Sequence, residues 1–204
     1  LVHATATVLP AAFAVGERTL ADGNSILTAA ISGFETVARI GRAVPHGFHR
    51  RGFHATSVCG VFSAALVASR LEGLSETEAV NALGIAGSQA SGSLEFLSDG
   101  SSTKQLHPGW CSLAGVTASR LASAGATGPD TILEGPYGLY HSYAGEIVEP
   151  ESVLDGLGSE WETSKITIKP YPVCQLSHAS LDALSQLLGE IPDLERGLSV
   201  AHLV

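Results

Sequence analysis

The first part of the chain, up to about residue 125, is patterned as helix. Apolar side chains recur there with the three-to-four-residue spacing of an α-helix, and no segment alternates with the two-residue period of a strand. The spacing therefore predicts helices throughout and no β-sheet between residues 5 and 125. The predicted helices cover residues 5–17, 24–44, 58–71, 75–89 and 112–123.

The composition of these helices indicates that they pack closely against one another. The segment 58–71 is apolar almost throughout, which is typical of a helix buried on all sides. Ser75 and Glu78 have the spacing of a capping box and mark where the following helix begins. Small residues on the helices let backbones approach, so we expect a tight helical bundle. The glycines concerned are Gly33, Gly41, Gly60, Gly84, Gly87 and Gly115.

The pattern changes in the last quarter of the chain. Residues 161–173 alternate at Ile166 and Ile168 and end in a proline-rich turn, which predicts a strand. A helix over 178–188 and a short strand over 198–204 are expected to follow. An open strand edge pairs readily with other strands, so we expect further chain, or a second chain, to complete this sheet.

The sequence therefore divides into two parts near residue 160. We expect residues 1–160 to form a mainly α, all-helical bundle domain that is incomplete at its N-terminus. Residues 161–204 are expected to begin a smaller α+β domain that is incomplete at its C-terminus. Leu1 begins in the middle of a pattern and the chain contains no Met, which indicates a piece of a longer protein.

Composition narrows the class of function. The formal net charge of −9 argues against a nucleic-acid partner, because a phosphate-binding surface is usually basic. No apolar run approaches the roughly 20 residues that span a bilayer, so no membrane partner is expected. Only 15% of the residues are charged, which indicates an apolar face covered by a second subunit in a homodimer. Three distant cysteines without a paired spacing predict reduced thiols in a cytoplasmic protein.

The most informative stretch covers residues 88–135. Two predicted helical runs flank a polar loop there, and this loop presents Asp99, Lys104 and His107. Loops held by packed helices are favoured places for functional side chains. The alternative is a solvated turn, but the small residues on both flanks favour a close backbone approach that a plain turn does not need.

The scarcity of cations points to the chemistry of the substrate. An acidic protein that binds several carboxylates has to gather positive charge locally, and this chain holds only 11 Lys and Arg. Lys104 and Lys169 are candidate carboxylate clamps, with ordinary surface lysines as the alternative. Tyr171 follows Lys169 by two positions and either donates a hydrogen bond to substrate or packs against Pro172.

Two histidines are candidates for proton transfer or substrate contact. His54 stands at the N-terminal edge of the apolar helix, and its imidazole titrates near neutral pH, which suits a general acid or base. The alternative is a cap-region imidazole that bonds to backbone. His107 follows Lys104 by three positions and either contacts substrate or positions the loop.

The chain contains none of the sequence patterns of nucleotide or covalent chemistry. There is no GxGxxG, no Walker pattern and no GxSxG elbow, which argues against phosphate binding and against a serine hydrolase. His46, His49 and His54 lack a further ligand at zinc-binding spacing, so no metal site is expected.

Six co-linear motifs resemble those of the MmgE/PrpD family. Residues 52–65 are similar to its GfHxTs…GxFgAA segment, and residues 88–109 to its signature around a Lys and a His. The match continues through residues 125–135 and 169–178, so the resemblance covers essentially the whole chain. His3 aligns with the His of the family's HPs segment, although the proline that follows in the family is replaced here.

The resemblance implies an architecture and a site. It implies a large helical domain and a smaller α+β domain with the site in the cleft between them, in a homodimer that works without metal or organic cofactor. It also implies the roles of six side chains. The catalytic residues would be His54, Lys104 and Lys169, and the substrate-binding residues His3, His107 and Tyr171.

The resemblance implies a lyase acting on a small di- or tricarboxylate. The reaction expected first is dehydration of a 2-methylcitrate-like substrate, in which a base removes the proton alpha to a carboxylate and an acid protonates the departing hydroxyl. Decarboxylation and epimerisation, the other reactions of the family, use the same charge stabilisation and stay open. The alternative from another class is a non-catalytic helical fragment that keeps the scaffold and dimer surface, because the family's upstream Asp-rich motif is missing from this chain.

Overall fold

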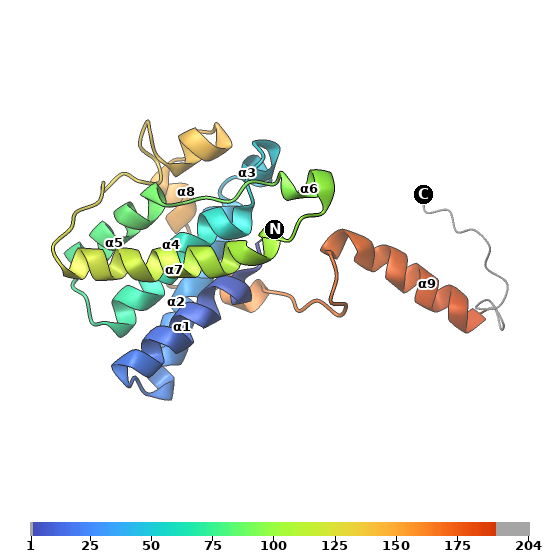
Figure 1. Cartoon of the computed structure of the whole chain (residues 1–204), viewed down its shortest axis with the longest axis horizontal. Coiled ribbons are helices and arrows are strands. Elements are labelled where there is room, and N and C mark those ends of the chain that lie inside the picture. The colour runs from blue at the N-terminus through green and yellow to red at the C-terminus, as the bar shows by residue number, and fades with distance from the viewer. Residues whose placement is uncertain (1, 191–204) are drawn as a thin grey trace. The chain divides into compact units, whose positions relative to one another are not determined.

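The computed structural model describes residues 2–190. They divide into two compact units, and the boundary along the chain lies between Lys165 and Ile166. Helices dominate the described residues, which confirms the expectation of a mainly α fold (Figure 1). In this part of the chain the only β pairing is a single bridge between Phe53 and Ser93. No sheet therefore lies between residues 5 and 125, as the spacing predicts.

The first unit contains all but one of the long helices described. The elements are α1 (Ala4–Thr19), α2 (Gly23–Arg42), α3 (Gly47–Arg50), α4 (Ala55–Leu71), α5 (Glu76–Ser88), α6 (Phe96–Asp99), α7 (Thr103–Ser123), η1 (Tyr140–Ala144), α8 (Pro150–Leu154) and η2 (Glu162–Lys165). The second unit has η3 (Gln175–Ser177) and α9 (His178–Glu190), the latter where the sequence predicts a helix. No helix within residues 2–190 combines the length and the hydropathy needed to cross a membrane.

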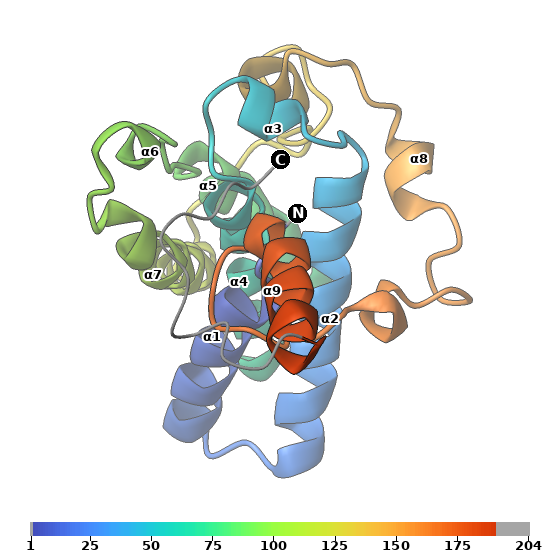
Figure 2. The same cartoon turned by 90° about the vertical axis from the view of Figure 1, so that its right-hand side faces the viewer.

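Helix α4 is the centre of the first unit. It packs against α1, α2, α5 and α7, which Figures 1 and 2 show arranged around it. Every residue of α4 is buried except Leu66, Arg70 and Leu71, so the predicted buried central helix is confirmed. Burial on all sides explains its sequence, because a helix with neighbours on every face has no polar stripe.

The glycines of the bundle lie where helices approach closely. A Cβ on Gly115 of α7 would come within 2.6 Å of the Val61 carbonyl oxygen and of Ala64 Cβ on α4. A Cβ on Gly60 would come equally close, at 2.6 Å, to the Thr7 methyl of α1. Real Cβ atoms do not tolerate such distances, so these glycines permit the observed spacing of α4 with α7 and α1.

Helix α7 is longer than the pattern predicts. The sequence favours a loop followed by a helix from residue 112, whereas the helix begins at Thr103. Pro108 and Gly109 are the breakers that favour the loop. Pro108 lies in the second turn and removes one helical hydrogen bond, a loss that packing of α7 against α4, α5 and α1 offsets. The prediction of a polar loop here is wrong for the residues from Thr103 onward.

The predicted strand over 161–173 is also wrong. Its first part forms the 3₁₀ turn η2 and the rest is irregular. A strand needs a partner for its backbone N–H and C=O groups, and no described segment pairs with this one. Ile168 is 94% exposed, so the alternation at the two isoleucines marks no buried face. The strand predicted over 198–204 lies outside the described residues.

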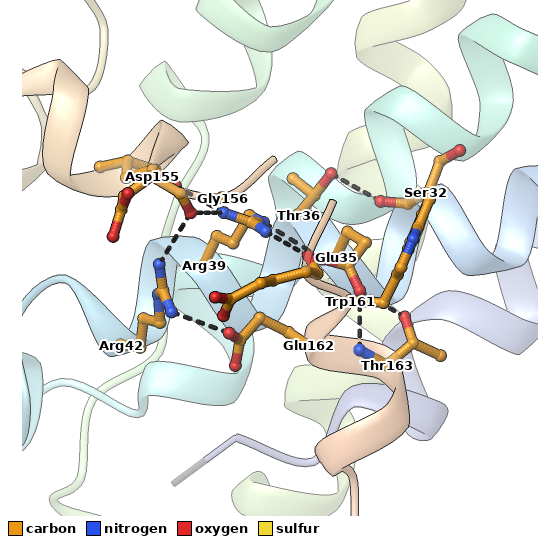
Figure 3. Close-up of polar contacts among 12 residues, drawn as sticks. Ser32, Glu35, Thr36, Arg39, Arg42, Asp155, Gly156, Trp161, Glu162 and Thr163 are labelled. Carbon is orange, nitrogen blue, oxygen red and sulfur yellow. Dashed lines mark hydrogen bonds and ion pairs between the residues drawn. The ribbon is translucent and has the colours of Figure 1, made fainter. Parts of the chain in front are cut away.

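A buried ion pair ties the end of the first unit to α2 (Figure 3). Arg39 Nε donates to Glu35 Oε2 at 3.1 Å, and both residues are at most 4% exposed. The Glu35 carboxylate also accepts the backbone N–H and the hydroxyl of Thr163, each at 2.7 Å. The Arg39 guanidinium donates to three backbone carbonyls, those of Val153, Asp155 and Glu160.

This arrangement explains the charge state of Glu35. Burial alone would raise the pKa of its carboxyl group, but the hydrogen bonds from Thr163 and Arg39 outweigh burial and hold the pKa below its usual range. The ionised pair therefore fixes the segment containing α8 and η2 against α2. Arg42, one turn further along α2, forms a more exposed ion pair with Glu162 at 2.8 Å.

Candidate active site

The first unit brings His54 and His107 into direct contact. His54 is the N-cap residue of α4, and its backbone N–H donates to the Gly92 carbonyl at 2.8 Å. His107 lies in the second turn of α7. The Nδ1 atoms of the two imidazoles are 3.0 Å apart, so a hydrogen bond joins the N-terminus of α4 to the second turn of α7.

Gly92 allows this contact by its lack of a side chain. Its φ of +118° suits glycine, and a Cβ at this position would lie 2.8 Å from Ser57 Cβ and 3.4 Å from His107 Nδ1. The Phe53–Ser93 bridge holds the same segment against the start of α4. The chain around Gly92 thus closes one side of the histidine pair.

His3 joins the same group from the start of α1. Its backbone N–H donates to Thr56 Oγ1 at 3.0 Å, and its ring Nδ1 lies 3.0 Å from the same oxygen. The His3 and His54 ring centroids are 6.2 Å apart. Thr56 therefore holds His3 beside His54, and the N-termini of α1, α4 and α7 meet at one place.

Phe96 and Lys104 complete the cluster. The Phe96 ring contacts His54 and His107 edge-on, with centroid distances of 6.0 Å and 5.8 Å. Lys104 Nζ lies 5.8 Å from the centroid of the Phe96 ring, close enough for a cation–π contact. The ammonium group thus stands next to the histidine pair, in the first turn of α7.

Both paired imidazoles are neutral at neutral pH. Burial lowers the pKa of His54 to about 4, and the nearby charges of His107, His3 and Lys104 contribute in the same direction. Burial also lowers the pKa of His107 below its usual value. A neutral imidazole has one protonated and one unprotonated nitrogen, so each ring is able to accept a proton and to donate one.

Four of the six side chains assigned from sequence therefore lie in one cluster. Asp99, the third polar residue of the predicted loop, is not part of this cluster. Its carboxylate accepts the backbone N–H of Ser101 at 2.9 Å and so stabilises its own turn. The four clustered residues are His3, His54, Lys104 and His107.

Lys169 and Tyr171 belong to the second unit. Lys169 Nζ donates to the Val173 carbonyl at 3.1 Å, and the Tyr171 hydroxyl donates to Asp182 Oδ1 at 2.6 Å. The hydrogen bond to Asp182 raises the pKa of Tyr171. Convergence of these two side chains on the cluster of the first unit stays a prediction.

Sequence reasoning did not identify Thr56, Gly92 and Phe96 as parts of the site. Thr56 and Gly92 lie within the motifs at residues 52–65 and 88–109, so their place in these motifs could have indicated that they belong to the site. Phe96 is a buried aromatic residue in the otherwise exposed segment 95–101, and its neighbour Leu97 is exposed, so no local pattern distinguished it.

The cluster differs from a metal centre and from a thiol site. The described residues include no group of three or more His, Cys, Asp or Glu side chains arranged to hold a metal ion. Cys59 and Cys111 are buried, and burial raises the pKa of Cys111 to about 12, so its thiol is protonated and unreactive. The side chains that the cluster itself offers are imidazole and ammonium groups.

Comparison with known proteins gives a consistent assignment. Residues 1–149 match the MmgE/PrpD N-terminal domain. A cis-aconitate decarboxylase of Aspergillus terreus is 35% identical over 214 residues, which cover 99% of this chain and 44% of that protein. The cis-aconitate decarboxylase-like protein oryM of Aspergillus oryzae is 30% identical, covering 94% of this chain and 42% of that protein.

The relationship extends beyond fungi. A cis-aconitate decarboxylase of Mus musculus is 31% identical over 146 residues, which cover 72% of this chain and 30% of that protein. The chain thus spans less than half the length of each of these curated relatives. Since the domain match covers most of the chain and the relatives align along nearly all of it, the chain belongs to the MmgE/PrpD family.

Proposed function

We propose that the whole protein is a lyase acting on a small tricarboxylate, with decarboxylation of cis-aconitate as the first candidate. The observation that carries this proposal is the junction of α1, α4 and α7, whose N-termini have no side-chain cap. In contrast, Asp22 caps α2 and Ser75 caps α5. Uncapped backbone N–H groups and aligned peptide dipoles stabilise an anion placed at such a junction.

Lys104 adds a full positive charge to this junction. It is half-buried beside Phe96, and an ammonium group that is partly withdrawn from water binds a carboxylate as a point charge. The two paired imidazoles are neutral, so they supply proton transfer rather than charge. Binding and proton transfer therefore come from different side chains of one cluster.

The names of the relatives decide the order of the candidate reactions. The family resemblance puts dehydration of a 2-methylcitrate-like substrate first, whereas the relatives described above are named cis-aconitate decarboxylases or are like them. We therefore place decarboxylation first. Dehydration is kept as the second candidate because it needs both a proton acceptor and a proton donor, and the histidine pair offers both.

Decarboxylation makes specific demands on this site. The bond between a carbon atom and its carboxylate breaks, CO₂ leaves, and the electron pair stays on carbon, delocalised toward the remaining carboxylates. Positive charge near those carboxylates stabilises that state, and Lys104 with the helix N-termini meets this demand. The carbon then accepts a proton, for which an imidazole N–H of the cluster is the donor.

The second unit is expected to complete the site in the whole protein. Lys169 would clamp a further carboxylate, and Tyr171 would donate a hydrogen bond to substrate. The different-class alternative, a helical fragment that keeps the scaffold without catalysis, applies to this chain in isolation. The whole protein is therefore the material for every activity measurement.

Replacing Lys104 with Ala tests the carboxylate clamp. With purified whole protein and cis-aconitate, we expect KM to rise about 10- to 100-fold, because a charge-assisted contact worth about 1.5–3 kcal/mol is lost. The thermal unfolding temperature should change little, since the ammonium group makes a cation–π contact but no ion pair within the described residues. CO₂ release from cis-aconitate and alkene formation from 2-methylcitrate are followed in parallel to separate the two candidate reactions.

The matched control is Lys165→Ala. Lys165 is an exposed lysine of the same unit that pairs with Glu160 and Glu162, so its removal should leave KM unchanged. An unchanged KM in the Lys104 variant would show that Lys104 does not bind a substrate carboxylate and is an ordinary surface lysine. Absence of turnover with cis-aconitate, 2-methylcitrate and iminodisuccinate would remove the lyase proposal as a whole.

We also propose that the whole protein is a cytoplasmic homodimer. Helix α7 exposes Leu106, Trp110 and Leu113, each more than half exposed, on successive turns. A second copy of the chain that covers these side chains would explain both their exposure and the low charged fraction. Sedimentation of the whole protein should show a dimer, and Leu113→Glu should weaken it; a stable monomer at micromolar concentration would contradict the proposal.

A further inference from the structure

His54 and His107 meet through the same ring nitrogen, and this sets a constraint on their protons. The Nδ1 atoms are 3.0 Å apart, with ring centroids 5.2 Å apart and ring planes tilted by 42°. A hydrogen bond between two Nδ1 atoms forms only when one is protonated and the other is not. Two neutral imidazoles in this contact must therefore be opposite tautomers.

We infer that His54 and His107 act as one proton-sharing pair of opposite tautomers. Of the two arrangements that the contact permits, we assign the one in which His54 holds its proton on Nδ1 and His107 holds its proton on Nε2, and the tautomer measurement below decides between them. Nε2 of His54 is then a proton acceptor, and Nε2 of His107 is a proton donor. The inference rests on the function proposed above and deepens it, because it assigns His107 a role in proton transfer. The sequence motifs imply substrate binding for that residue.

The surroundings hold the pair in place. His54 is anchored by its backbone bond to Gly92, and Phe96 packs edge-on against both rings. Ser57 Oγ donates to the His107 backbone carbonyl at 3.5 Å, which links the helix of one ring to the helix of the other. Within residues 2–190 neither ring makes another side-chain hydrogen bond, so no protein group occupies either Nε2 atom.

The pair moves a proton with a closed balance. His107 gives its Nε2 proton to the carbon from which CO₂ has left, so a C–H bond forms and an N–H bond breaks. The shared proton passes from His54 Nδ1 to His107 Nδ1, and His54 takes a proton from water at Nε2, leaving a hydroxide that the released CO₂ takes up as bicarbonate. The reverse relay resets the pair: His107 takes a proton from water at Nε2, the shared proton returns to His54 Nδ1, and His54 gives its Nε2 proton back to water. In a dehydration, the proton reaching His54 comes from the substrate carbon, and the one leaving His107 goes to the departing hydroxyl.

The groups around the pair oppose a third proton, which would give the pair a positive charge. His107, His3, Lys104 and His49 each disfavour a positive charge on His54. The pair therefore remains neutral at neutral pH, with one proton shared between the two Nδ1 atoms and one on His107 Nε2. Without the hydrogen bond to His107, nothing among the described residues around His54 favours a proton on its Nδ1.

Two substitutions of His107 separate the parts of this inference. His107→Asn keeps an acceptor oxygen at the place of Nδ1, whereas His107→Gln carries its amide one bond further out, near the place of Nε2. Nitrogen NMR of the chain labelled with ¹⁵N-histidine reports which ring nitrogen carries the proton. Gln105→Asn, an exposed change on the same turn of α7, is the control.

We expect opposite tautomers for His54 and His107 in the unsubstituted chain at pH 7. His54 should keep its Nδ1 proton in His107→Asn and in the Gln105 control, and should change to the Nε2 tautomer in His107→Gln. In the whole protein, kcat with the accepted polycarboxylate should fall at least 10-fold in both His107 variants, because the donor is gone, while KM changes less than threefold.

The outcomes separate this inference from the proposed function. The same tautomer on both rings, or kcat values of both His107 variants equal to that of the Gln105 control, would overturn the pair. Opposite tautomers with the Nδ1 proton on His107 would overturn the assigned direction of proton transfer. Opposite tautomers in a whole protein that turns over none of the polycarboxylates would uphold the pairing and overturn the proposed function instead.

Discussion

Replacing His54 with Gln in the whole protein should lower kcat about 10²- to 10⁴-fold, the usual range for loss of a general acid or base. Gln has a similar size and keeps polar atoms at the N-terminus of α4, but it neither takes up nor releases a proton near neutral pH. His54 is 4% exposed and bonded to His107, so its removal takes away both a reacting group and half of the pair. Steady-state kinetics with cis-aconitate measures the effect.

His141→Gln is the matched control, because His141 is an exposed histidine of the first unit in η1, and its loss should leave kcat unchanged. Circular dichroism of both variants checks that the helices remain. Turnover of the His54 variant within a few-fold of the unsubstituted protein would remove His54 from the proton-transfer role.

The His54→Gln variant also tests how the free energy of unfolding depends on pH. The pKa of His54 is about 4 in the fold against 6.5 in the unfolded chain, so the unfolded state binds the proton first. Stability contributed by neutral His54 is complete above about pH 6.5 and is lost as the pH falls toward 4. His54→Gln should therefore flatten the decline of the unfolding free energy over this range.

Replacing Arg39 with Ala should destabilise the first unit by about 3–5 kcal/mol, the usual effect of removing one partner of a buried ion pair. Glu35 would stay buried without its guanidinium partner, and the carbonyls of Val153 and Glu160 would lose their donor, whereas the Asp155 carbonyl would keep its bond from Arg42. Urea unfolding followed by circular dichroism measures the change.

Arg42→Ala is the matched control on the same helix. It removes the same charge and an ion pair to Glu162, but from a more exposed position, so we expect about 0–1 kcal/mol. Equal effects of the two substitutions would show that the contacts of Arg39 in Figure 3 add nothing beyond a surface charge. Limited proteolysis between α8 and η2 should also accelerate in the Arg39 variant and not in the Arg42 variant.

The helices of the bundle could be predicted from sequence because their signal is local. The apolar period places α1, α2, α4 and α5 to within a few residues, and the capping box of Ser75 and Glu78 is present as predicted, with Glu78 Oε2 accepting the Ser75 N–H at 2.8 Å. The two errors, the loop before α7 and the strand over 161–173, fall where local preference competes with packing. Pro108 favours a break that the bundle overrides, and the alternating isoleucines lack a pairing partner.

By itself the sequence identified the candidate residues of the site. The motifs singled out His54, Lys104 and His107, and the low number of cations indicated a carboxylate substrate. Only the tertiary structure decided how these groups act on each other. The histidine pair, the hold of Thr56 on His3, and the clamp between Arg39 and the last turns of the unit join residues 53 to 121 positions apart. Such contacts depend on how helices pack, and packing is a sum of many weak interactions that no short pattern encodes.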